Sequence, residues 1–101
     1  MNFEGVAGAV EQWHHDRNLI EGSTNKDQYI KLIEEIAEIG EGITKSDKNA
    51  IMDGIGDALV VLINIAAREG VELTDCLFYA YNEIKDRKGR MVNGVFVKES
   101  K

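Results

Sequence analysis

The sequence predicts an all-α protein, an antiparallel bundle of about four helices followed by a short C-terminal extended arm or hairpin. Three observations support this fold class. Apolar residues recur at helical spacing in four segments, short polar breaks separate these segments, and proline is absent. A length of 101 residues suits one domain over residues 1–101. Because so small a core is marginal alone, we expect the chain to oligomerise and so to bury apolar helix faces.

The first two helices are predicted from apolar spacing and a capping signal. Residues 3–19 place apolar side chains at steps of three and four, and Trp13 falls on this face, which is typical of a core residue. A polar loop follows, in which Thr24 or Asn25 can cap a second helix. That helix is expected over residues 26–43.

The third and fourth helices and the tail follow from similar signals. Ser46 can cap a third helix over residues 47–69, and Gly70 is a natural residue to end it. A fourth helix is expected over residues 75–88. The tail, residues 91–97, holds an Asn-Gly pair between short apolar pieces, which is typical of a small hairpin or an extended arm.

Composition excludes several classes of function. The net charge of −6 argues against a general nucleic-acid or anionic-membrane binder. Cys76 is the only cysteine, so no internal disulfide can form, and we expect a buried thiol in a reducing compartment. No signal peptide is evident, which favours a cytoplasmic protein. The apolar run 58–67 is about half a membrane span and is expected to be a core helix. His14 is expected at the surface.

Acidic residues crowd the second helix. Glu34 and Glu35 each lie within one turn of Glu38, and such like-charge pairs are destabilising. Lys31 is the local compensating charge. The helix is expected to turn its isoleucines to one side and these charges to the other. A solvated polar face is one interpretation of this pattern.

The third helix carries acids within an apolar stretch. Asp53 and Asp57 lie one turn apart, and Asn64 continues the same stripe. The stripe could reach solvent at one edge of the bundle. If it faces the second helix instead, the carboxylates converge and need a cation, because unpaired ionised acids are costly to bury. Oxygen ligands suit Mg²⁺ or Mn²⁺, and no Cys/His cluster for zinc is present.

These acids resemble the motifs of the MazG-like, all-α nucleoside triphosphate pyrophosphohydrolases. That family is marked by E-E-x-x-E on one helix and E-x-x-D on the next, and residues 34–38 match the first motif in full. Asp57 matches the aspartate of the second motif, but Gly54 stands at the glutamate position, and Asp53 offers a substitute. The ligand set that the resemblance implies is Glu34, Glu35, Glu38, Asp57 and Asp53.

The resemblance implies an activity and a set of roles. The activity is Mg²⁺-dependent hydrolysis of a nucleoside triphosphate, with a deoxynucleotide preferred, to the monophosphate and pyrophosphate. Glu35 is expected to act as general base, and Lys31 to stabilise phosphate charge. Trp13 could stack on a base. Asn82 and Lys85 resemble an Asn/Lys element on the last helix of the family. Lys85 and Arg87 could stabilise charge on phosphate oxygens of the substrate, or could simply be cations favoured at a helix C-terminus. The resemblance also implies a homodimer or homotetramer in a bacterial or phage-infected cytoplasm.

Two alternatives remain open at this point. Gly54 in place of glutamate favours a non-catalytic helical module whose acidic faces bind a basic partner. Within hydrolases, a diphosphate or phosphomonoester substrate is the other alternative, which release of orthophosphate would reveal.

Overall fold

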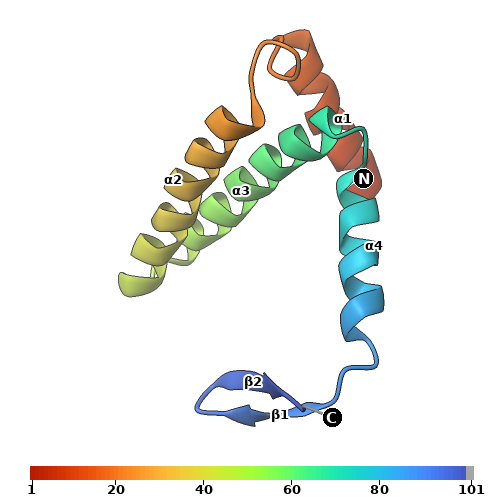
Figure 1. Ribbon diagram of the computed structural model, residues 1–101. Helices are drawn as coiled ribbons and strands as arrows, with labels where there is room; N and C mark the ends of the chain where they lie inside the picture. The colour runs from red at the N-terminus through yellow and green to blue at the C-terminus, as the bar shows by residue number, and fades with distance from the viewer. Residues whose placement is uncertain (100–101) are drawn as a thin grey trace.

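The fold consists of four helices and a terminal hairpin, as a computed structural model of residues 1–99 shows (Figure 1). The elements are α1 (Phe3–Asp16), α2 (Asn25–Thr44), α3 (Lys48–Arg68), α4 (Leu73–Ile84), β1 (Gly89–Val92) and β2 (Val95–Lys98). The prediction of a mostly helical chain is confirmed. Helix α1 is shorter than predicted because Asn18 takes a left-handed conformation (φ 56°), which ends the helical path.

Helices α2 and α3 lie side by side as an antiparallel pair, which is the most extensive helix packing among residues 1–99 (Figure 1). The predicted cap of α2 is confirmed, since the Thr24 side chain accepts a hydrogen bond from the Asp27 amide. The predicted cap of α3 is wrong by one residue. Asp47 caps α3 by accepting from the Ala50 amide, whereas Ser46 sits in the turn with a φ of 52°.

The two paired helices approach each other closely at glycine. A Cβ atom on Gly54 would lie 2.7 Å from Cγ1 of Ile39, and one on Gly42 would lie 3.1 Å from Cγ1 of Ile51. Since carbon atoms normally approach no closer than about 3.5 Å, glycine at position 54 sets the helix spacing. The same contact keeps a larger side chain away from this position.

The four helices do not close into a bundle within one chain. Among residues 1–99, α1 and α4 each pack mainly on α3, and α4 leads away from the α2–α3 pair (Figure 1). The radius of gyration is 16.1 Å, whereas a compact chain of about 100 residues has a value near 13 Å. The antiparallel bundle expected from sequence is therefore only an antiparallel pair in the single chain.

The C-terminal part confirms a hairpin. Helix α4 ends at Ile84, earlier than the predicted residue 88. Strands β1 and β2 then pair antiparallel, with Arg90 opposite Val97. Asn93 and Gly94 join them with φ values of 51° and 82°. Positive values at both positions define the turn that an Asn-Gly pair favours, because its twist matches that of the strands.

The core is small and lies mainly along α3. Its buried apolar side chains are those of Ile20, Ala58, Val61, Ile63 and Ala66. By length and composition α3 could cross a membrane, but a buried core helix passes the same test.

Four sequence expectations about burial are wrong. Helix α2 turns Ile33 and Ile36 outward, at 49% and 55% exposure, and buries Glu35 instead. Trp13 is 44% exposed, so it is not a core residue. The Cys76 thiol is exposed. His14 is buried, as described below.

Candidate functional site

The α2–α3 pair brings three acidic side chains together. Glu35, Glu38 and Asp57 each offer a carboxylate oxygen, and these oxygens all lie within 4.8 Å of one another. Glu35 and Glu38 come from successive turns of α2, and Asp57 comes from the facing side of α3. We call these three residues the acidic triad. Three oxygen ligands in this arrangement match the preference of Mg²⁺ and Mn²⁺.

Glu35 is the buried member of the triad, at 5% exposure. Its Oε1 lies 3.3 Å from Nζ of Lys31, while its Oε2 is buried and has no hydrogen-bond partner within residues 1–99. A buried carboxylate oxygen without a partner costs free energy. A cation bound by the triad would satisfy it, so the donor set fits a divalent metal.

The electrostatics of the triad also favour a cation. Repulsion from the Glu35 carboxylate raises the pKa of Glu38. Burial raises the pKa of Asp57, and repulsion from Asp53 and then Glu35 adds to this effect. Lys31 opposes both shifts, and its own pKa is raised by its hydrogen bond to Glu35. The negative charges are therefore only partly compensated by the protein.

The two other predicted metal ligands lie outside the triad. The Glu34 side chain is 61% exposed, and its Oε2 lies 3.8 Å from Nζ of Lys31. Asp53 is exposed, and it shares with Glu38 the lining of a hollow of about 360 Å³ near the α2–α3 turn. Asp53 is thus a neighbour of the triad rather than a member. Gly54, against Ile39, leaves no room for the glutamate of the family motif.

The remaining predicted site residues lie apart from the triad within one chain. Trp13 is on α1, where the Arg17 guanidinium carbon lies 4.3 Å from its ring centroid. Asn82 is on α4, and Lys85 and Arg87 follow it, on the part of the chain that leads away from α2 and α3 (Figure 1). Their substrate-binding roles stay predictions.

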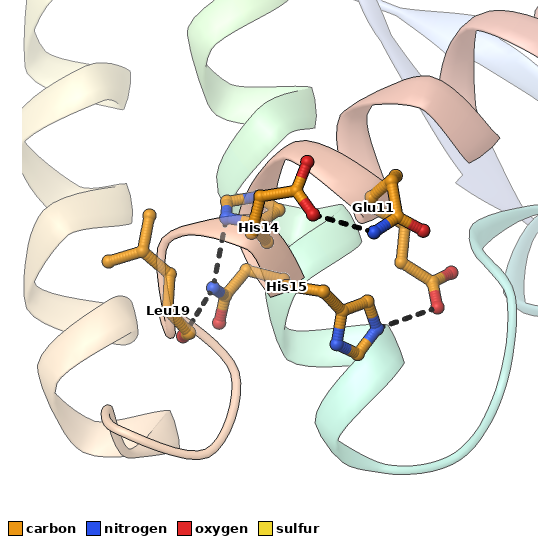
Figure 2. Close-up of polar contacts among 7 residues, drawn as sticks. Glu11, His14, His15 and Leu19 are labelled. Atoms are coloured by element: carbon orange, nitrogen blue, oxygen red, sulfur yellow. Dashed lines mark hydrogen bonds and ion pairs between the residues drawn. The ribbon is translucent and has the colours of Figure 1, made fainter.

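A buried polar network between α1 and α3 was missed from sequence (Figure 2). His14 is 3% exposed, and its Nε2 lies 2.9 Å from the Val60 carbonyl oxygen. A carbonyl only accepts, so Nε2 carries the proton and Nδ1 accepts from the Asn64 amide at 3.2 Å. Asn64 also donates to the Leu19 carbonyl at 2.9 Å. Asn64 is thus fully buried and does not continue the acidic stripe.

Arg68 completes this network. Its guanidinium donates to the carbonyl oxygens of Leu19 and Ile20 and to the side-chain oxygen of Asn25, at 2.7–3.0 Å. These contacts fix the loop between α1 and α2 on the end of α3. A lone Asn in an apolar helix was the available signal, but its partners come from distant segments.

Comparisons with known proteins find a similarity to a phage protein. The chain matches no family model and no solved structure. It is 43% identical over 63 residues to a protein of Haemophilus phage HP1, described as an uncharacterized 18.2 kDa protein in the rep-hol intergenic region. The matched part is 62% of this chain and 39% of the phage protein, so the chain spans well under half of that relative.

Proposed function

We propose that this chain is a Mg²⁺-dependent nucleoside triphosphate pyrophosphohydrolase of the MazG-like type. The acidic triad is the observation that carries the proposal, because it joins residues of both family motifs around a buried, unpartnered Glu35 oxygen. The likeness to a phage protein is compatible with a phage origin. The reaction is attack of water at the α-phosphorus, with pyrophosphate as the leaving group.

Each triad residue has a role in this proposal. Glu35, Glu38 and Asp57 would hold the metal. When bound, Mg²⁺ supplies positive charge to the phosphate oxygens and acidifies a coordinated water. Glu35 would accept the proton of the attacking water through Oε1, the oxygen beside Lys31, which leaves the buried Oε2 for the metal. Lys31, whose Nζ lies 3.3 Å from Oε1 of Glu35, orients that carboxylate. Its positive charge would also stabilise the negative charge that develops on the phosphate oxygens in the transition state.

The test is hydrolysis of a panel of NTPs and dNTPs with Mg²⁺, with identification of the products. We expect a monophosphate and pyrophosphate, with a deoxynucleotide as the best substrate. Glu38→Gln and Asp57→Asn should each lower the rate by about 100-fold or more, since losing even a partner of a metal ligand costs 10–100-fold. Glu41→Gln is the matched control, because this exposed α2 carboxylate pairs with Lys45 instead.

A non-catalytic module is the second candidate, and Gly54 favours it. Gly54 packs so closely against Ile39 that a glutamate does not fit at position 54. The site therefore lacks one ligand that the family motif supplies. Calorimetry with Mg²⁺ and Mn²⁺ separates the two functions. The enzyme should bind metal and lose this binding on Asp57→Asn, whereas the module should bind a basic partner without metal. Release of orthophosphate in the panel would instead indicate the phosphomonoester or diphosphate alternative.

We also propose that the enzyme works as a cytoplasmic homodimer or homotetramer. Helix α2 exposes four apolar side chains at successive spacings of four, three and seven residues, namely those of Tyr29, Ile33, Ile36 and Ile43. This spacing makes one continuous apolar seam, on a different side of α2 from Glu35. A second copy packed on this seam would complete a helical bundle and leave the triad open to substrate. Sedimentation of Ile36→Asp, which should give a smaller assembly, tests this.

A further inference from the structure

The C-terminal part of the chain leaves its apolar surface uncovered. We call residues 73–98, which form α4 and the hairpin, the arm. Leu77, Ala80, Tyr81 and Ile84 lie at three- and four-residue spacing on one face of α4, yet Leu77 is 66% exposed and Ile84 52%. In the described structure α4, β1 and β2 have no buried residue. An amphipathic helix of this kind is ordinarily packed against a partner.

The surface area of the whole chain leads to the same conclusion. The accessible surface is 7850 Å², whereas a compact monomer of 11.3 kDa exposes about 5,700 Å². The excess of roughly 2,100 Å² is more than the ~800 Å² that each partner buries in a standard interface. The chain therefore has enough uncovered surface for the arm to take part in a stable contact.

A groove on the body of the molecule suits the arm. It has a volume of about 810 Å³ and runs between α1 and α3, with Val6, Val10, Met52 and Leu59 among its lining residues. Asp53 and Asp57 also line this groove. Residues 1–72 carry 14 acidic and six basic side chains, whereas the arm, residues 73–98, carries three acidic and five basic ones. The body and the arm thus have opposite net charge, and the basic side chains of the arm all follow Ile84, so the hairpin end of the arm supplies the attraction to the acidic body.

We propose that the arm of one copy docks through its Leu77–Ile84 face into the α1–α3 groove of a second copy. Within its own chain the arm leads away from the α2–α3 pair (Figure 1). Gly70, with a φ of 76°, and the hydrogen bond from the Val71 amide to the Ala66 carbonyl fix the turn from which α4 departs. In a two-fold dimer each copy gives an arm and receives one, so both grooves are covered. This inference does not require the proposed catalytic function, although Asp57 of the triad lines the same groove.

Thiol cross-linking tests the contact directly. Cys76, the only native cysteine, is exposed on α4 next to Leu77. Val6→Cys or Met52→Cys adds a second thiol in the groove. A short bismaleimide should then give a covalent dimer with at least one of the two variants. Removing Cys76 by Cys76→Ser should abolish the product, and Gln12→Cys, on another face of α1, should give none.

Sedimentation equilibrium gives the second readout. The double variant Leu77→Asp/Tyr81→Asp should at least halve the assembly mass while circular dichroism stays unchanged, because both side chains are exposed in the single chain. Three results overturn the proposal. They are a monomeric native protein, an unchanged mass of the double variant, and a cross-link confined to one chain, which would mean that the arm folds onto its own body.

Discussion

Gly54 controls the spacing of the α2–α3 pair, and Gly54→Ala tests this. The added Cβ would lie 2.7 Å from Cγ1 of Ile39, about 1 Å inside normal contact. Overpacking of this kind costs about 1–3 kcal/mol, while alanine gains up to about 1 kcal/mol in helix propensity. Gly56→Ala is the matched control on the same helix, since its Cβ would meet nothing within 4 Å. Gly56→Ala should therefore show only the gain in stability from helix propensity.

The propensity term cancels between the two variants, which isolates the packing cost. We expect Gly54→Ala to be less stable than Gly56→Ala by about 1–3 kcal/mol in urea unfolding. This difference corresponds to roughly 5–20 °C in melting temperature for a domain of this size. In an Ile39→Ala background the difference should disappear, because the clashing Cγ1 is absent. Equal stability of the two variants in the native background would refute the close approach.

Three further predictions concern the turn, the triad and the buried network. Ser46→Gly should stabilise the fold by up to about 1 kcal/mol in urea unfolding, because Ser46 has a φ of 52°, and any loss would contradict this. Without divalent metal, the raised pKa values of Glu38 and Asp57 mean that the native state binds protons more tightly than the unfolded chain. Stability from these groups should therefore fall as pH rises from about 4 through the raised values, and Glu38→Gln should reduce that slope in unfolding measured across pH. His14→Ala removes the partner of the Val60 carbonyl and of the Asn64 amide, and should cost about 1–3 kcal/mol in thermal unfolding; an unchanged melting temperature would rule out this role.

The helix positions were largely predictable because their signals are local. The Thr24 cap, the left-handed Gly70 after α3 and the Asn93-Gly94 turn each depend on a few neighbouring residues. The early end of α1 was not predictable in the same way. Asn18 takes its left-handed conformation within a loop that Arg68 holds through the adjacent Leu19 carbonyl, a contact from a distant part of the chain.

The orientation of α2 could not be read from its own pattern. Helical spacing separates isoleucines from glutamates, but it does not say which side meets α3. The small Gly42 and Gly54 allow the closest approach on their side of the pair, and this turns Glu35 inward. The isoleucine side is then left for another partner. Predicting this required the packing of two helices rather than the pattern of one.

The candidate site was predicted in part for the same reason. The sequence indicated five acids on two helices, and the structure brings Glu35, Glu38 and Asp57 together while Glu34 and Asp53 stay outside. Adjacent residues on a helix point about 100° apart, so only one of Glu34 and Glu35 can face α3. Which one does so depends on the same glycine contacts.

The triad is contained within one helical hairpin, and this affects how the protein folds. Only residues 45–47 separate α2 from α3, so pairing these helices closes a short loop at low entropic cost. We expect this pairing to occur early in folding, before α1 and α4 attach. This pairing brings the three carboxylates of the triad together, so their repulsion raises the free energy of the folding transition state. If the triad binds metal as proposed, a divalent cation should accelerate refolding as well as stabilise the folded chain, which stopped-flow measurements with and without Mg²⁺ would reveal.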